Sequence, residues 1–225
     1  MSEDGVPSRE MHPSVVGRAD EMTALADAVR RLIAATMLNR APAADVERVA
    51  RDVDEVARQL EQHVPDPPPP VTNMQGGGVV ADDGSFADHM AFDFVVGRFN
   101  PMALPIVVSF EPERVVGRGQ FTLPYEGPPG CVHGAVIAAS FDIVLTAANI
   151  LAGAAGPTVS LTTRYRRPTL LHVESVLEAW VERVEGARVH TRGRLLQGEK
   201  VTVECEGVFA VLDRERTISL AREGH

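Results

Sequence analysis

The chain has 225 residues, of which 44% are hydrophobic and 24% charged, and its formal net charge at pH 7 is −9. This length suits one sizeable domain with an appendage, and the composition is that of a globular protein that buries a core. The acidic balance argues against nucleic acid as a partner, and the two cysteines, Cys131 and Cys205, form neither a disulfide framework nor a metal-binding pattern.

The N-terminal part of the chain predicts a helical hairpin. Apolar residues recur at helical spacing over Glu21–Met37 and again from Val46 to Leu60, with charged residues on the opposite side. The turn between the two segments is short, which favours antiparallel helices. The pattern leaves open what their apolar stripes pack against: each other, the rest of the chain or a partner subunit.

Five prolines between Pro65 and Pro70 end this hairpin and predict a stiff, extended spacer. A polar stretch with three consecutive glycines follows it. We therefore divide the chain into a helical hairpin (1–64), a Pro/Gly-rich linker (65–90) and a main domain (91–225).

The main domain predicts antiparallel strands around one helix. Segments rich in Val, Thr and Leu predict strands at 107–110, 114–123, 158–165, 173–184, 187–197 and 200–212. Between the second and third of these lies His133–Leu151, which is too long for a strand and apolar nearly all round, so it must be a buried helix. The order predicts an α+β hotdog fold, a curved antiparallel sheet wrapped around a long central helix, with the helical hairpin at its N-terminus.

The N-terminal residues are acidic and polar, unlike a signal peptide, and no stretch approaches ~18 consecutive apolar residues. We therefore expect a cytoplasmic protein with free thiols and no membrane span.

Asp142 lies in the middle of the predicted central helix, where an ionised carboxylate is costly to bury unless it is paired or used. Thr146 and Asn149 follow at i+4 and i+7 and share its face. Two interpretations remain: the stripe lines a substrate cleft, or it is a solvated or interface-facing stripe without chemistry.

A glycine- and proline-rich turn, YEGPPGCVHG over residues 125–134, leads into the helix. The first N–H groups of a helix have no internal partners, and the helix dipole there favours negative charge. Because Gly134 has no side chain, a substrate oxygen can approach its N–H closely, as in an oxyanion site. The alternative is a glycine needed only for the turn.

The segment Gly130–Ala135, followed by Asp142, resembles the HGG…D signature of PaaI-like hotdog acyl-CoA thioesterases. His133 precedes Asp142 by nine positions and Gly134 precedes it by eight, as in that family. Ala135 replaces the second glycine of the signature, and we expect the site to survive this change because the oxyanion N–H belongs to Gly134.

Two further segments resemble the family: Tyr165–Pro168, a Tyr-x-x-Pro strand end, and Phe99–Met102 upstream. The resemblance implies hydrolysis of acyl-CoA thioesters to free acid and coenzyme A. Asp142 is then the general base or the nucleophile, Gly134 N–H holds the oxyanion, and a hydroxyl of Thr158 or Ser160 orients the attacking water.

The two hydroxyls are expected to face the same side of their strand, because alternate residues do. His133 either polarises the thioester or holds the turn together. Arg166 and Arg167, with Arg164, either meet the phosphates of coenzyme A or form a solvated strand end. The candidate substrate-binding residues are Asn100, Ala135, Thr146, Asn149, Arg166 and Arg167.

The resemblance also implies a homodimer, or a dimer of dimers, with sheets joined edge to edge. Each site would take His133 and Gly134 from one subunit and Asp142 from the other. We expect no cofactor beyond the coenzyme A of the substrate, and no metal, because the seven histidines lack ligand spacing. The rival function is a non-catalytic acyl-CoA- or lipid-binding hotdog protein, while a hotdog dehydratase would need a His–carboxylate motif that is absent.

Overall fold

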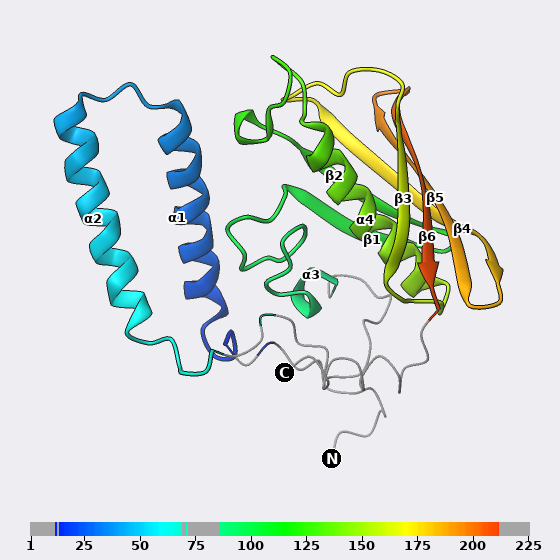
Figure 1. The fold of residues 1–225 in the computed structure, drawn as a ribbon, viewed down its shortest axis with the longest axis horizontal. Helices are drawn as coiled ribbons and strands as arrows, with labels where there is room; N and C mark the ends of the chain where they lie inside the picture. The colour runs from blue at the N-terminus through cyan, green and yellow to red at the C-terminus, as the bar shows by residue number, and fades with distance from the viewer. Residues whose placement is uncertain (1–11, 13, 69–70, 72–85, 212–225) are drawn as a thin grey trace.

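Six strands form one antiparallel sheet that curves around a long helix, α4 (Gly134–Leu151), in the computed structural model (Figure 1). The structure describes residues 12, 14–68, 71 and 86–211. Along the sheet the order is β1 (Ile106–Glu111), β2 (Arg114–Gln120), β4 (Glu174–Glu185), β5 (Arg188–Gln197), β6 (Lys200–Ala210) and β3 (Thr158–Tyr165). This arrangement confirms the predicted hotdog fold.

Apolar side chains of α4 fill the concave side of the sheet. Phe141, Val144 and Leu145 are completely buried there, as are Leu177 and Phe209 from the strands opposite. Two strand glycines let the helix come close: a Cβ at Gly193 would lie 3.1 Å from Phe141, and one at Gly207 would lie 3.0 Å from Leu145. Apolar burial on this scale is the main favourable term in folding.

Helix α4 is also long and apolar enough to cross a membrane by length and composition alone, with a mean hydropathy of 1.8 over its 18 residues. The core helix of a globular domain passes the same test, and α4 packs along β4, β2 and β5.

The strand ends differ in detail from the prediction. The strand expected at 114–123 ends at Gln120, because Leu123–Tyr125 forms a 3-10 turn, η1, with a proline at its start. The last strand is described to Ala210, and residue 212 lies outside the described residues. Most of the predicted linker lies outside them too, but the short helix α3 (Phe86–His89) is described, and Phe86 belongs to the main core.

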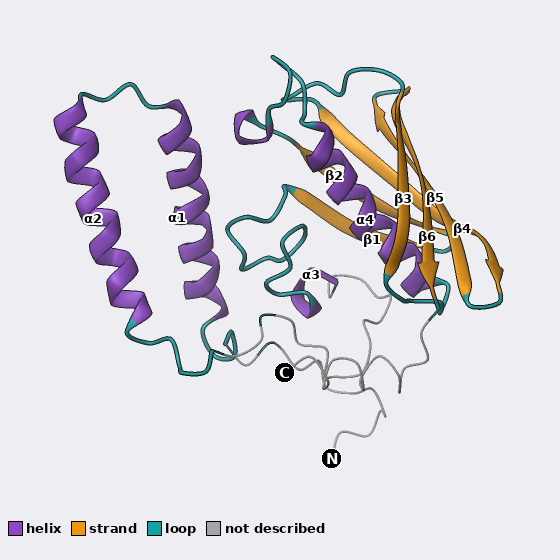
Figure 2. Ribbon diagram, viewed as in Figure 1, coloured by secondary structure: helices purple, strands orange, loops and turns teal. Residues whose placement is uncertain are grey.

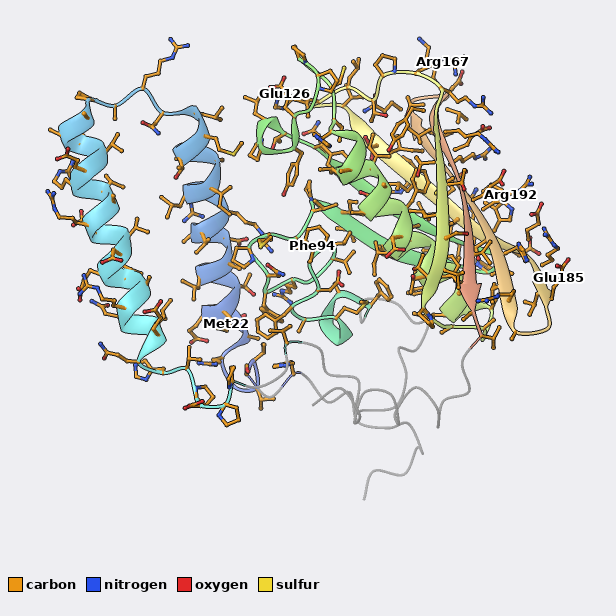
Figure 3. All side chains as sticks on the ribbon, in the orientation of Figure 1. Met22, Phe94, Glu126, Arg167, Glu185 and Arg192 are labelled. Carbon is orange, nitrogen blue, oxygen red and sulfur yellow. The ribbon has the colours of Figure 1, made fainter. Side chains whose placement is uncertain are left out.

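The outer face of the sheet carries cross-strand ion pairs. Arg194 and Arg114 both contact Glu178, at 2.6 and 2.8 Å, and Arg192 lies 3.1 Å from Glu182. Figure 3 shows Arg192 and Glu185 on the side of the sheet turned away from α4. These alternating charges keep one face in water while the other covers the helix.

The predicted hairpin is present as two antiparallel helices, α1 (Ala19–Leu38) and α2 (Ala43–Glu61), beside the main domain (Figure 2). Helix α1 docks on the loop before β1: Ala26 is buried, and Met22 packs against the small cluster of Val15, Ala91 and Phe99. The Arg30 guanidinium donates hydrogen bonds to the carbonyl oxygens of Arg98 and Asn100, at 3.0 and 2.7 Å.

Helix α2 has no buried residue. Its apolar stripe lies open along the helix: Val46, Val49, Val53, Val56 and Leu60. The first apolar stripe of the hairpin therefore packs on the main domain around Met22 and Ala26, with Ile33 and Met37 exposed at its far end, whereas the second has no cover from the described residues of this chain.

Candidate active site

Asp142 is half-buried in the middle of α4, and a side chain from β3 contacts it. The hydroxyl of Thr158, the first residue of β3, donates a 2.7 Å hydrogen bond to Asp142 Oδ1. The pair joins two of the residues that the sequence singled out. It leaves the second carboxylate oxygen of Asp142 without a hydrogen-bond partner among the described residues.

The expectation that Thr158 and Ser160 face the same side is wrong. In the register between β3 and β6, Thr158 lies opposite Phe209 and Ser160 opposite Val208, with an irregularity between them. This bulge adds one residue, Val159, and so reverses the side of the sheet that the following side chains face. Phe209 is buried in the core and Val208 is its outward neighbour, so Thr158 faces α4 and Ser160 faces outward.

The polar stripe predicted on α4 is not continuous. Thr146 is half-buried, one turn beyond Asp142, but Asn149 is completely buried against the sheet. The hydroxyl of Thr191 on β5 donates to Asn149 Oδ1, and Asn149 Nδ2 has no hydrogen-bond partner in the part of the chain described here. Asn149 thus faces the core, away from any open surface.

A buried thiol lies beside Asp142. Burial raises the pKa of Cys205 to about 11, the Thr163 hydroxyl 3.7 Å away opposes this, and the negative charge of Asp142 adds to the rise. The thiol is therefore protonated at neutral pH and is a poor nucleophile. The position of Cys205 near Asp142 was not predictable from sequence, because only the pairing of β6 with β3 brings it there.

His133 caps the start of α4. Its Nδ1 accepts a 3.0 Å hydrogen bond from Ala135 N–H, and its carbonyl oxygen accepts from Val136 and Ile137 at 3.0 and 3.2 Å. Of the alternatives for His133, the structure shows it holding the turn. The N–H of Gly134 is the one N–H in this first turn that has no acceptor among the described residues.

A cavity of about 470 Å³ opens at this end of α4. It brings together Gly134, Arg166 and Arg167 from the predicted set, above an apolar lining. Its other lining residues are Pro128, Cys131, Val132, Ile137, Tyr165, Pro168 and Thr169. Ala135 is exposed beside Gly134. The smaller hollow at the opposite end of α4, about 210 Å³, contains none of the predicted site residues.

The arginines of the basic cluster have partners. Arg166 forms an ion pair with Glu204 at 2.7 Å, and Arg164 forms one with Glu206 at 2.8 Å. Arg167 donates to the carbonyl oxygen of Val201, a neutral group, at 2.8 Å. Within this cluster, Arg167 therefore has the positive charge least compensated by a carboxylate.

Asn100 serves the fold of its own loop. Its side-chain amide donates to Phe92 O at 2.9 Å, and its Oδ1 accepts from Met102 N–H at 2.9 Å. Asn100 lines neither the cavity nor the surroundings of Asp142.

Two clusters of predicted residues therefore lie along α4. His133 and Gly134 lie at its N-terminus, with Arg166 and Arg167 beside the same cavity, and Asp142 with Thr158 lies in its middle. Eight residues of α-helix separate Gly134 from Asp142, about 12 Å. Among the described residues, no group of three or more His, Cys, Asp or Glu is placed to hold a metal ion.

A contact between Tyr165 and Gly134 was not predicted from the sequence. The Tyr165 hydroxyl donates a 2.8 Å hydrogen bond to the Gly134 carbonyl oxygen. Tyr165 belongs to the Tyr-x-x-Pro segment that resembles the family, but the resemblance implied no function for its side chain.

Comparisons with known proteins identify a family for the chain. The family model of the thioesterase superfamily matches residues 129–204, which include both clusters. The acyl-coenzyme A thioesterase THEM4 of Xenopus laevis is 36% identical over 69 residues, 30% of this chain and 31% of that protein, so the match spans about a third of the curated relative.

Among solved structures, a thioesterase superfamily protein is 35% identical with a TM-score of 0.73, and the match covers 84% of this chain and 94% of that one. The phenylacetic acid degradation protein PaaI of Thermus thermophilus is 19% identical with a TM-score of 0.46, over 48% of this chain and 95% of that one. The match to the thioesterase superfamily protein covers 84% of this chain, which is about 189 of its 225 residues. Only 140 residues lie between Phe86 and the C-terminus, so this match extends into the N-terminal helices.

Proposed function

The chain belongs to the thioesterase superfamily, and from this premise we propose that it hydrolyses acyl-CoA thioesters to a free acid and coenzyme A. The observation that carries the proposal is Asp142, a carboxylate in the apolar central helix that is held by Thr158 at 2.7 Å. A carboxylate in such a place is retained at a cost in stability, and it is useful when it serves chemistry.

In the proposed reaction, Gly134 N–H holds the oxygen of the thioester carbonyl as it becomes negative. The unpaired state of this N–H at a helix N-terminus supports the assignment, since the donor needs no rearrangement before it binds the oxyanion. His133 supports it indirectly, because the cap that it forms fixes the first turn of α4.

Asp142 either takes a proton from a water that attacks the carbonyl carbon, or attacks that carbon itself to give an anhydride that water then opens. In both routes the carbon–sulfur bond breaks and coenzyme A leaves as the thiol. Thr158 holds the carboxylate and leaves its second oxygen open to the water or the substrate.

We further propose that one site uses two subunits. About 12 Å of helix between Gly134 and Asp142 is too far for one carbonyl group to contact both. Strand β3 is at one edge of the sheet, and no described residue pairs with its outer side, which supports a partner at this position because an unpaired edge readily pairs with another strand. Two antiparallel copies would bring Gly134 of one chain toward Asp142 of the other.

The cavity beside Gly134 is the proposed place for the substrate next to the reacting carbonyl. Arg167, which lines this cavity, is the proposed contact for a coenzyme A phosphate, because no carboxylate of the described residues pairs with it. Asn149 and Asn100 have no part in this proposal, since their side chains bond within the fold.

The test is cleavage of a panel of acyl-CoAs with aromatic, short and long acyl groups, followed by loss of thioester absorbance so that the protein's own thiols do not interfere. Asp142→Asn should keep the fold and lower kcat by ~10²–10⁴-fold. Binding of acyl-CoA without cleavage would instead favour the non-catalytic binding protein, and wild-type turnover in Asp142→Asn would remove Asp142 from the mechanism.

A further inference from the structure

Tyr165 holds the residue that supplies the proposed oxyanion donor. Its hydroxyl donates a 2.8 Å hydrogen bond to the carbonyl oxygen of Gly134, across 31 residues of sequence. Tyr165 is the last residue of β3 and lies opposite the buried Val203, so its side chain is on the α4 side of the sheet.

The tyrosine ring also limits the space beside residue 134. A Cβ built on Gly134 would lie 3.2 Å from Tyr165 Oη and 3.3 Å from Cζ, closer than ordinary van der Waals contact. The backbone of Gly134 is outside the left-handed region, so any residue could adopt it. The missing side chain therefore makes room for the ring of Tyr165.

Two side chains thus hold the peptide group that follows Gly134. His133 Nδ1 accepts from Ala135 N–H, and Tyr165 donates to Gly134 O, so both ends of the Gly134–Ala135 peptide are held by side chains. The first turn of a helix is otherwise its least restrained part. The direction of the free Gly134 N–H depends on this turn.

The phenol is suited to a permanent donor role. Burial raises the pKa of Tyr165 above its usual range, and the nearby Cys205 adds to this, so the hydroxyl keeps its proton at neutral pH. Tyr165 also lines the cavity beside Gly134. It therefore lies next to the space proposed for the substrate while its hydroxyl is already used by the backbone.

We propose that Tyr165 is a positioning residue, which aims the N–H of Gly134 at the thioester oxygen by holding the Gly134 carbonyl and filling the space beside its Cα. The inference rests on the proposed function. Because an oxyanion donor acts mainly in the transition state, its misalignment lowers kcat more than it changes KM.

The experiment compares the two tyrosines of the chain. Tyr165→Phe removes the hydroxyl and keeps the ring, and we expect kcat to fall about 5- to 100-fold with KM within about twofold, as for a lost hydrogen bond that shifts a donor by up to ~1 Å. Tyr125→Phe is the matched control, since its hydroxyl also donates to a backbone carbonyl, that of Ala103, at 3.2 Å. It should leave kcat within about twofold.

A double-mutant cycle isolates the contact itself. Gly134→Ala should lower kcat in the wild-type background, because the added methyl pushes on the ring. It should cost less than about twofold once Tyr165→Ala has removed the ring. Thermal unfolding of each variant, and the amide resonance of residue 134 in Tyr165→Phe, separate a shifted turn from an unfolded protein.

Wild-type kcat in Tyr165→Phe, an equal loss in Tyr125→Phe, or additive effects of Gly134→Ala and Tyr165→Ala would each overturn the positioning role while leaving thioester hydrolysis intact. A wild-type protein that cleaves no acyl-CoA would overturn the proposed function and this role together.

Discussion

Thr158 and Asp142 are joined by a 2.7 Å hydrogen bond that ties the edge strand β3 to the middle of the central helix. The next hydroxyl along the strand, that of Ser160, is turned away by the bulge between them. One of two hydroxyls that look equivalent in the sequence is thereby placed at the carboxylate.

We expect Thr158→Val to lower kcat by about 10- to 100-fold, because a hydrogen bond to a charged group is worth roughly 1.5–3 kcal/mol. Thr158→Ser keeps the hydroxyl and should retain most of the activity. Ser160→Ala is the matched control and should stay close to wild type. A larger loss in Ser160→Ala than in Thr158→Val would mean that Ser160, and not Thr158, serves the carboxylate.

Sites shared between subunits predict recovery of activity in mixed dimers. Gly134→Pro removes the N–H while suiting the first position of a helix, and His133 before it is already extended, with ψ of 133°. Unfolding and refolding Gly134→Pro chains together with Asp142→Asn chains should restore up to about a quarter of the wild-type sites, since half of the dimers are mixed and each holds one intact site.

Gly134→Ala is the control for Gly134→Pro. Both substitutions place a Cβ against Tyr165, but alanine keeps the N–H of residue 134. If mixed dimers form, as shown by differently tagged chains purifying together, and no activity returns, each site belongs to a single chain.

The two helices of the hairpin should respond differently to a buried charge. Ala26 of α1 is 1% exposed, whereas Val53 of α2 is 39% exposed. Ala26→Asp places a carboxylate in the closely packed contact with the main domain and should release α1, seen as faster hydrogen exchange of α1 amides. Val53→Asp should leave that exchange unchanged.

Sedimentation of the Val53→Asp protein gives a second reading of the same variant. A smaller assembly than wild type would show that another chain covers the stripe of α2. Slow exchange of α1 in Ala26→Asp would contradict the docked position of α1.

Cys205 predicts a loss of stability at high pH. The folded state raises its pKa from 9.0 to about 11, so the folded protein holds this proton more tightly than the unfolded chain. The stabilisation is complete below about pH 9 and is lost as the pH rises through about 11, on the order of 2–3 kcal/mol in total.

Urea unfolding of wild type and Cys205→Ala from pH 8 to 11 measures this. The difference in unfolding free energy between them should shrink as the pH rises. The raised pKa of Tyr125 acts in both proteins and cancels, and a Tyr165→Phe background removes the shift of Tyr165, to which Cys205 itself contributes. A difference that is independent of pH would contradict the assignment.

The features that were predictable from sequence are those set by local pattern. The sequence of α4 is apolar nearly all round and so requires a covered helix, and the alternating segments around it require a sheet with one dry face. The spacing of Gly134 and Asp142 is a property of the helix itself and needs no tertiary contact.

Contacts that depend on strand register were not predictable. The letters Thr158, Val159 and Ser160 alternate in the same way with or without a bulge, so the sequence placed both hydroxyls on one side. Arg166 and its partner Glu204 meet only because β3 pairs with β6, which gives the basic cluster far less free charge than its three arginines suggest. The surface that covers the apolar stripe of α2 was not predictable either, because an amphipathic pattern shows that one side of a helix is apolar but not what packs against it.

The place of β3 in the sheet orders the assembly of the site during folding. Strands β4, β5 and β6 follow one another through short turns at Gly186 and Gly198, so they pair by closing short loops. Strand β3 precedes them in sequence but pairs with β6, the last of the three, and this closure costs more chain entropy. We therefore expect the hydrogen bonds that Thr158 and Tyr165 of β3 make to α4 to form only after the C-terminal strand has paired, so a refolding chain should bury its central helix before it completes the proposed site.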